Sequence, residues 1–258
     1  MEIRLATNEI VRAYLTRPWP KATSKRPGVR INMVSSFDGK VNLPQDDLSL
    51  TEAGLGSNLD KYLMKVLRTR ADMVLNGAET LRLSSSEPKV DRDELSSIRE
   101  KEGFSKHPIG AVISKKGADL PLKKAFFNNP DYEAVVFVSE SAPKVNIKKI
   151  QATGRKVFTF PDNDFKALAE IIRTRFGVER LLLEGGPSIA AEFVRAGLVD
   201  EIYQTLSYTL VSGSENQGIK TFLQGATFKK GELKKLTPLS IFYVPETNEL
   251  YQSVQVEN

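Results

Sequence analysis

Cysteine is absent from this 258-residue chain, and histidine occurs only once, as His107. The lack of cysteine excludes disulfides, thiolate nucleophiles, iron–sulfur clusters and cysteine-ligated zinc. A single histidine excludes multi-histidine metal sites, and any serine–histidine–aspartate triad would depend on that one residue. We therefore expect no metal site, and most hydrolase, metalloenzyme and thiol chemistries are excluded.

Long apolar runs and concentrated charge are also lacking. No apolar run approaches the roughly 20 residues that span a bilayer, and the N-terminal MEIRLATNEIVR carries charges where a signal peptide would be apolar. These features predict a cytoplasmic protein without a membrane partner. The net charge is +5, but Lys and Arg are spread along the chain, so no nucleic-acid partner is expected. A small phosphorylated ligand suits the same mild positive charge.

Short apolar runs alternate with helical patterns from Val29 onward, which is typical of an α/β fold. Near-continuous apolar runs suit strands that are buried on both faces of a parallel sheet. The strands predicted in this way are 29–34, 71–76, 109–114, 134–139, 156–160 and 180–185, and the predicted helices are 58–70, 163–176 and 187–196.

The C-terminal part of the chain has a different pattern. Segments of high β-propensity follow one another there, and a turn over 245–248 separates the last two, 239–244 and 249–256. We therefore predict a mixed, mostly parallel sheet that ends in an antiparallel hairpin. Residues 1–27 are interpreted as an N-terminal arm and residues 28–258 as a single domain.

Three loops directly follow predicted strands, which is where open α/β sheets bind ligands. The loop LEGGPS, residues 183–188, has two glycines that allow close backbone approach, and the next helix offers free N–H groups to a phosphate. The alternative is a plain tight turn. Glu184 argues against this alternative, because a carboxylate at the end of a buried strand needs a partner.

The other two loops also have two interpretations each. The loop NGAET, residues 76–80, could cradle a pyrophosphate, or it could be a glycine turn with Thr80 as a helix N-cap. In SSFDGK, residues 35–40, Asp-Gly signals a turn, while Asp38 could bind or protonate a polar substrate. The GxGxxG fingerprint and the Walker A pattern are both absent, which argues against a Rossmann domain and a P-loop NTPase.

Taken together, the loops resemble a known family, the pyrimidine reductases of the riboflavin pathway. RPGVRINMVSSFDGKV is similar to their N-M-x-x-S-x-D-G strand, and LRTRADMVLNGAETLR resembles their R-x-x-A-D-x-x-x-x-G-x-x-T segment. LLLEGGPSIAAEFVRAGLVDEIY is similar to their L-x-x-E-G-G block, which ends in L-V-D-E. The order and spacing of the three motifs fit that family from about residue 27 almost to the C-terminus.

The resemblance implies a dihydrofolate-reductase-like three-layer fold, a homodimer and NADPH bound without a Rossmann fingerprint. The family reaction reduces the ribosylamino group of a pyrimidinone 5′-phosphate to a ribitylamino group by hydride transfer to ribose C1′. Such a reaction needs no metal and no protein nucleophile, because the cofactor carries the reactive atom. The composition of this chain is compatible with that chemistry.

The resemblance also implies which residues form the site. Asp38 and Glu184 are the catalytic candidates, and either would stabilise an imine cation or relay a proton. The substrate-binding candidates are Asn32, Ser36, Asp38, Gly39 and Arg82. The cofactor-binding candidates are Asn76, Gly77, Ala78, Thr80, Ser114, Lys115, Glu184, Gly185, Gly186, Pro187 and Ser188. Ser114 and Lys115 would contact the 2′-phosphate of the cofactor, although they could equally be ordinary loop residues.

One departure from the family pattern leaves the substrate open. Where the family continues into an acidic-x-Pro stretch, this chain has LRLSSSEP, residues 81–88. A pterin, dihydrofolate or another small imine or carbonyl compound is therefore an alternative substrate. A more remote alternative is a non-enzymatic nucleotide- or RNA-binding protein. The chain lacks a deaminase segment with zinc ligands, so a bifunctional enzyme is not predicted.

Overall fold

The computed structural model describes residues 2–43, 55–84, 87–225 and 227–257. The chain divides into two compact units. The parallel unit contains residues 21–28 and 68–186, and the hairpin unit contains residues 1–20, 29–67 and 187–258. Within the described ranges, no helix is both long enough and apolar enough to cross a membrane.

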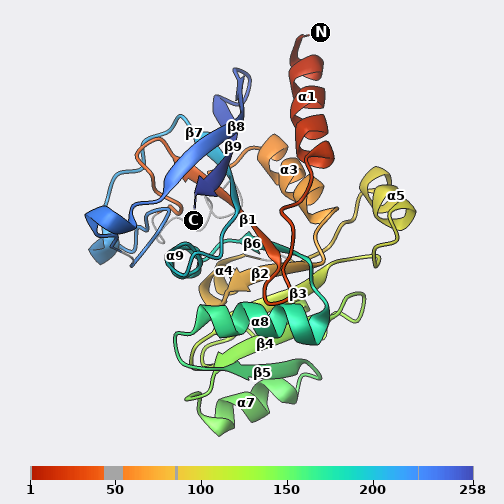
Figure 1. Cartoon of the computed structure of the whole chain (residues 1–258), viewed down its shortest axis with the longest axis vertical. Coiled ribbons are helices and arrows are strands. Elements are labelled where there is room, and N and C mark those ends of the chain that lie inside the picture. The colour runs from red at the N-terminus through yellow and green to blue at the C-terminus, as the bar shows by residue number, and fades with distance from the viewer. Residues whose placement is uncertain (1, 44–54, 85–86, 226, 258) are drawn as a thin grey trace. The chain divides into compact units, whose positions relative to one another are not determined.

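The parallel unit is built on five parallel strands in the order β5-β4-β3-β2-β6 (Figure 1). All six residues of β4 are buried, as expected for a strand that is covered on both faces. The strands are β2 (Met73–Gly77), β3 (Ile109–Ser114), β4 (Ala134–Ser139), β5 (Lys156–Phe160) and β6 (Arg180–Glu184). The helices are α4 (Ala78–Leu83), α5 (Asp93–Lys101), α6 (Ala125–Asn128), α7 (Lys144–Gln151) and α8 (Phe165–Phe176).

Helices pack on both faces of these strands. Val136 of β4 belongs to a buried cluster with Phe127 of α6 and Ile150 of α7. Its neighbour Phe137 points to the opposite face, where its ring centroid lies 5.9 Å from that of Phe176 in α8. The alternation of side chains along β4 therefore builds three layers in the parallel unit.

The hairpin unit combines parallel and antiparallel pairing. Strand β1 pairs in parallel with β7, β7 pairs antiparallel with β9, and β9 pairs antiparallel with β8. Asn248, in the turn of the hairpin, has a φ of +52°, a conformation that asparagine tolerates better than most residues. The elements are α1 (Glu2–Thr16), β1 (Gly28–Ser36), α3 (Asn58–Arg68), α9 (Pro187–Arg195), β7 (Glu201–Ser207), β8 (Lys235–Val244), β9 (Glu249–Glu257) and the short 3-10 helices η1 (Glu215–Gln217) and η2 (Lys230–Glu232).

A buried arginine ties the end of α1 to the strands of the hairpin unit. The side chain of Arg30 in β1 is 1 % exposed and pairs with Glu201 of β7 at 2.8 Å. Its guanidinium also donates to the carbonyl oxygen of Pro18 at 2.8 Å and lies 4.3 Å from the ring centroid of Trp19. These contacts hold the segment that follows α1 against the start of β1.

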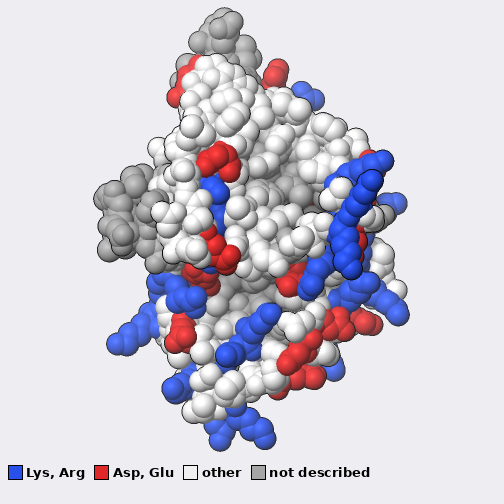
Figure 2. Space-filling view, turned by 90° about the vertical axis from the view of Figure 1, so that its left-hand side faces the viewer, with Lys and Arg blue, Asp and Glu red and all other residues white. Residues whose placement is uncertain are grey.

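On the face of the molecule that Figure 2 shows, Lys and Arg side chains are interspersed with Asp and Glu side chains. Several positive side chains of the parallel unit pair with acidic ones, such as Lys89 with Asp131 at 3.0 Å and Arg70 with Glu102 at 3.1 Å. On this face, positive charge therefore forms no single stripe of the kind that follows a nucleic-acid backbone.

The predicted fold class is confirmed. Each predicted strand and helix is present within a few residues, and the hairpin around 245–248 ends the mixed, mostly parallel arrangement. The structure adds helices that periodicity did not reveal, namely α1 within the predicted arm and α4, α5, α6 and α7. The single domain predicted over 28–258 stays a prediction. Ser85 and Ser86 of the unusual LRLSSSEP segment lie outside the described residues.

Candidate active site

The predicted cofactor residues of the parallel unit gather at one edge of its strands. The register pairs Gly77 of β2 with Ile113 of β3, and Leu75 of β2 with Leu183 of β6. The carboxyl ends of three neighbouring parallel strands therefore meet at this edge, which is where ligands bind in sheets of this kind.

The turn after β6 approaches α4 unusually closely. Gly185 and Gly186 have φ angles of +81° and +84°, a region that L side chains rarely adopt. A Cβ atom on Gly185 would lie 2.9 Å from Cγ2 and 3.0 Å from Oγ1 of Thr80. Only glycine fits both this backbone conformation and this spacing. Two of the three predicted loops are therefore in direct contact.

Thr80 does not cap a helix. The N-cap of α4 is Gly77, which has an extended backbone and makes no side-chain cap. Thr80 lies three residues further, inside the helix, and its side chain faces Gly185. The alternative interpretation of Thr80 as an N-cap is therefore wrong.

Glu184, at the end of β6, forms a buried ion pair with Arg68. Its Oε1 accepts from Nε of Arg68 at 2.8 Å, and its Oε2 accepts from Nη2 at 2.6 Å. Arg68 is 3 % exposed and Glu184 5 %. This is the two-pronged geometry that makes guanidinium–carboxylate pairs strong. Because both carboxylate oxygens already accept from one guanidinium, this arrangement positions Glu184 rather than leaving it ready to donate a proton.

Further contacts fix Arg68 itself. Its Nη1 donates to the carbonyl oxygen of Glu87 at 2.7 Å. Its own carbonyl accepts from Nη1 of Arg99 at 2.9 Å, and Arg99 also donates to the carbonyl oxygens of Thr69 and Ala71. Burial lowers the pKa of Arg99 to about 10. Hydrogen bonds within the parallel unit thus fix the turn that follows Arg68 and leads into β2.

An unsatisfied acceptor lies near the same edge. Oδ1 of Asn76, the last residue of β2 before Gly77, is buried and has no hydrogen-bond partner among the described residues. A buried acceptor without a donor costs about 1–3 kcal/mol. A ligand that carries an N–H or O–H group could remove this cost.

The remaining candidates of the parallel unit are less enclosed. Ser114 at the end of β3 is buried, and Nζ of the exposed Lys115 donates to Oδ1 of Asn163 at 2.8 Å. Arg82 in α4 is exposed, and its Nη1 lies 3.4 Å from the carbonyl oxygen of Asp119 in the segment after β3. Both cations remain accessible to an anionic ligand.

In the hairpin unit, the loop after β1 is organised around Asp38. Oδ1 accepts from the Ser36 hydroxyl at 2.6 Å and from the Val211 N–H at 3.1 Å, and Oδ2 accepts from the Ser212 N–H at 2.7 Å. These hydrogen bonds, led by that of Ser36, lower the pKa of Asp38 from 3.8 to about 2. Gly39 supports the turn with a φ of +76°. Asp38 is therefore an exposed, ionised carboxylate near neutral pH.

Asn32 shares one face of β1 with Ser36, because side chains alternate along a strand. Asn32 is half-buried, whereas Ser36 is fully buried. The predicted substrate residues Asn32 and Ser36 thus lie on β1, and Asp38 and Gly39 lie in the turn that follows it.

Pro187 and Ser188 form the first turn of α9, where the carbonyl oxygen of Pro187 accepts from the Gln224 N–H at 3.3 Å.

Several residues that organise the site were not predicted. Arg68 is the arginine of the R-x-x-A-D motif, so its position was visible in the sequence although its role was not. Val211 and Ser212 bind Asp38 through backbone N–H groups, which carry no sequence signal. Arg99 lies in a helix that periodicity did not reveal.

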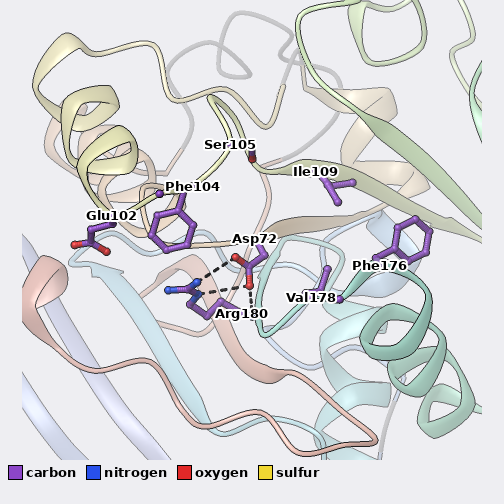
Figure 3. A pocket seen from close by; sticks show the side chains of 10 residues that line it. Asp72, Glu102, Phe104, Ser105, Ile109, Phe176, Val178 and Arg180 are labelled. Carbon is purple, nitrogen blue, oxygen red and sulfur yellow. Dashed lines mark hydrogen bonds and ion pairs between the residues drawn. The ribbon is translucent and has the colours of Figure 1, made fainter.

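A cavity of about 280 Å³ lies at the opposite edge of the parallel unit (Figure 3). It is lined by Asp72 before β2, by the first residues of β3 and β6, and by Phe104. Nη2 of Arg180 lies 3.4 Å from Oδ1 of Asp72, and the Arg180 guanidinium lies 4.0 Å from the centre of the Phe104 ring. Oδ2 of Asp72 also accepts from the N–H groups of Glu179 and Arg180. These contacts are internal, and none of the predicted site residues lines this cavity.

Comparison with known proteins adds an independent observation. Residues 27–244 match the RibD C-terminal domain family. The chain is 33 % identical over 221 residues to a 2,5-diamino-6-ribosylamino-4(3H)-pyrimidinone 5′-phosphate reductase of Aquifex aeolicus, with 84 % of this chain and 90 % of that protein covered. It is 27 % identical over 213 residues to the protein of the same name from Archaeoglobus fulgidus, with 82 % and 93 % covered.

Solved structures share the fold. A pyrimidine reductase-like protein of Corynebacterium diphtheriae superposes with a TM-score of 0.79 at 20 % identity, covering 96 % of this chain and 99 % of that one. A riboflavin biosynthesis reductase of Saccharomyces cerevisiae superposes with a TM-score of 0.61 at 15 % identity, covering 96 % and 98 %.

Proposed function

This chain belongs to the RibD C-terminal domain family, and on that premise we propose that it is an NADPH-dependent reductase of riboflavin biosynthesis. Its substrate would be 2,5-diamino-6-ribosylamino-4(3H)-pyrimidinone 5′-phosphate, the compound in the name of its relative from Aquifex aeolicus. The product would carry a ribitylamino group. The contact between Gly185 and Thr80, two residues of separate predicted cofactor loops, is the structural observation that carries this proposal.

The residues at the carboxyl edge of the parallel unit fit a dinucleotide. Gly185 offers backbone without a side chain, and Thr80 offers a hydroxyl beside it. The buried Oδ1 of Asn76 would accept a hydrogen bond from the ligand. Lys115 would attract the 2′-phosphate that distinguishes NADPH from NADH. NADPH, when bound, supplies the hydride.

The protein then has to position the substrate and stabilise charge. Asp38 is ionised at neutral pH, so it accepts hydrogen bonds and stabilises positive charge as the imine of the opened ribose forms. A carboxyl group with a pKa of about 2 is not a proton donor near neutrality. We therefore assign charge stabilisation to Asp38, and we assign to Glu184 the positioning of the turn that contains Gly185.

The first test is a titration of the purified protein with NADPH and with NADH, followed by fluorescence or calorimetry. We expect micromolar binding of NADPH and weaker binding of NADH, with the difference reduced in Lys115→Ala. Lys25→Ala, which removes an exposed lysine of the arm, is the matched control and should leave both affinities unchanged. If neither cofactor binds, the cofactor assignment is wrong.

The second test identifies the substrate. NADPH oxidation is followed with the pyrimidinone 5′-phosphate and, separately, with dihydrofolate. Turnover with the pyrimidinone phosphate alone supports the proposal. Turnover with dihydrofolate alone would instead show that the fold and cofactor serve another substrate class, as the unusual LRLSSSEP segment left open. We also expect the enzyme to act as a homodimer in the cytoplasm.

A further inference from the structure

The short helix α4 of the parallel unit ends against a lysine side chain, that of Lys124. Its Nζ donates to three carbonyl oxygens at the end of the helix. They belong to Leu81 at 3.0 Å, Arg82 at 2.7 Å and Ser84 at 2.8 Å. An ammonium group has three N–H donors, so these acceptors use all of them. A helix of six residues is too short to be stable by itself, and a cation at its C-terminal end binds carbonyl groups that lack partners within the helix.

Lys124 is itself fixed by the helix that it precedes. It is the N-cap residue of α6, and Phe126 of that helix is buried in the same apolar cluster as Leu81 of α4. Arg155, which precedes β5, donates through Nε to the carbonyl oxygen of Phe126 at 3.0 Å and through Nη2 to that of Asn129 at 2.5 Å. Packing and hydrogen bonds thus fix α6 as the base from which Lys124 reaches α4.

The other end of α6 binds the chain beyond α4. Nδ2 of Asn129, the C-cap residue of α6, donates to Oε1 of Glu87 at 2.7 Å. Pro88 follows and packs on β3, where a Cβ atom on Gly110 would lie 2.9 Å from its Cγ. A side chain at each end of α6 therefore binds the segment LRLSSSEP, which departs from the family pattern.

The end of α4 is coupled to Thr80 within one helical turn. The carbonyl oxygen of Thr80 accepts from both the N–H and the hydroxyl of Ser84, each at 2.9 Å. The Thr80 side chain faces Gly185, since a Cβ atom there would lie 2.9 Å from its Cγ2. This spacing leaves no room for α4 to move toward the turn after β6. A movement away would withdraw the Thr80 hydroxyl from that turn.

We propose that Lys124 is a positioning residue, which fixes the C-terminal end of α4 and so keeps the Thr80 hydroxyl beside the turn that contains Gly185. The consequence for the cofactor rests on the proposed function, in which this hydroxyl and this turn bind NADPH. The three donors of Lys124 serve carbonyl oxygens, so its effect on the cofactor is exerted through Thr80. Even a small displacement of a binding group weakens the interactions that it makes.

Hydrogen exchange of the cofactor-free protein, measured by NMR, tests whether Lys124 holds α4. Lys124→Met keeps the apolar stem and removes the ammonium group. We expect the Ser84 N–H, which binds the Thr80 carbonyl oxygen, to exchange about tenfold faster or more, because the hydrogen bonds of a charged group are lost. The matched control is Lys123→Met, an exposed lysine next to it in the chain, which should leave this rate unchanged. An unchanged rate in Lys124→Met would overturn the proposal.

Titration with NADPH, at a temperature where every variant is folded, tests whether this position matters for the cofactor. We expect Lys124→Met to raise the Kd about tenfold, while Lys123→Met leaves it unchanged. In the background of Thr80→Ala, Lys124→Met should raise the Kd much less, because Lys124 acts through Thr80. An equal increase in both backgrounds would contradict this route. If Lys124→Met fails to fold, Lys124→Gln, whose amide keeps two N–H donors, replaces it in both measurements with a smaller expected effect.

Ionic strength separates positioning from a direct attraction between Lys124 and the cofactor phosphates. Salt screens a direct attraction, so the ratio of variant to wild-type Kd would then fall toward one as the ionic strength rises. Positioning leaves that ratio unchanged, and a falling ratio would overturn the proposal. If the wild type binds no NADPH, the proposed function is wrong, whereas the exchange rate of the Ser84 N–H still decides whether Lys124 holds α4.

Discussion

The ion pair between Arg68 and Glu184 joins the end of α3 to the end of β6 through a buried contact. Both side chains are almost fully buried, and the guanidinium meets both carboxylate oxygens. Removing one partner of such a pair leaves the other charge buried and unpaired, which costs about 3–5 kcal/mol.

This cost leads to a prediction about folding stability. Arg68→Met and Glu184→Gln should each lower the free energy of unfolding by about 3–5 kcal/mol. The double variant Arg68→Met with Glu184→Gln should lose less than the sum of these two single losses, because no charge is left unpaired. Urea unfolding followed by circular dichroism measures all of them. Additive losses would contradict the coupling of the two side chains.

The second prediction at this scale concerns Asp38 and pH. Its pKa is lowered from 3.8 to about 2 in the folded chain. The stabilisation that it provides is therefore fully present above pH 3.8 and is lost as the pH falls through about 2. When the free energy of unfolding is measured against pH, wild type should therefore be more stable than Asp38→Asn above pH 3.8, and this difference should disappear as the pH falls through about 2.

The same carboxylate is expected to matter for turnover. Asp38→Asn should lower kcat far more than it lowers the affinity for NADPH. The ratio of wild-type to variant kcat should stay constant through the neutral range, because the wild-type carboxylate does not titrate there. Ser36→Ala, which removes the hydroxyl donor but keeps the charge, should have a smaller effect. An equal loss of kcat and of NADPH affinity in Asp38→Asn would show that Asp38 contributes to binding the cofactor and not specifically to turnover.

At the scale of elements, the turn after β6 is set by a glycine that packs against a helix. Gly185→Ala would place a Cβ 2.9 Å from Cγ2 of Thr80 at a strained φ of +81°. We expect a loss of stability of about 1 kcal/mol from the backbone and, in addition, at least a tenfold loss of NADPH affinity.

A matched variant separates the two effects. Gly177 ends α8 at a φ of +65°, and nothing lies within 4 Å of a Cβ there. Gly177→Ala should therefore lose similar stability without losing NADPH affinity. Thr80→Ser, added to Gly185→Ala, removes Cγ2 and should recover part of the affinity. Equal NADPH affinities for Gly185→Ala and Gly177→Ala would show that Gly185 does not lie against the cofactor.

The N-terminal arm is expected to contribute to stability as an element. Trp19→Ala removes the ring that covers the buried guanidinium of Arg30 and should lower the free energy of unfolding by about 1–3 kcal/mol. Trp19→Phe keeps a ring and should lose less. Lys25→Ala, an exposed substitution in the same arm, is the control. Unchanged urea midpoints for Trp19→Ala would show that the arm contributes little.

Much at the element scale could be predicted from the sequence because the strands are buried on both faces. A nearly continuous apolar run such as AVVFVS of β4 is typical of a strand that is buried on both faces. The helices that escaped prediction have physical reasons. Helices α4 and α6 are too short, at six and four residues, to display a helical period. Helix α1 precedes a proline-bearing basic segment, so the whole region was interpreted as an arm.

At the scale of the whole molecule, three motifs in the right order were sufficient to predict the family, and the match over residues 27–244 confirms it. The partners of the site residues could not be predicted in the same way. Glu184 meets an arginine 116 positions earlier, and Asp38 meets backbone more than 170 positions later. Sequence patterns report local burial and turn chemistry, whereas such contacts arise only when distant segments fold together.

The pairing of Arg68 with Glu184 also constrains how this protein can change over generations. A lineage that loses only the arginine, or only the glutamate, keeps an unpaired buried charge. Its protein therefore loses a large share of its folding stability. Replacement therefore requires two nearly simultaneous substitutions, or a stabilising change elsewhere that comes first. The two positions should be inherited together, so that descendants keep both residues or have exchanged both.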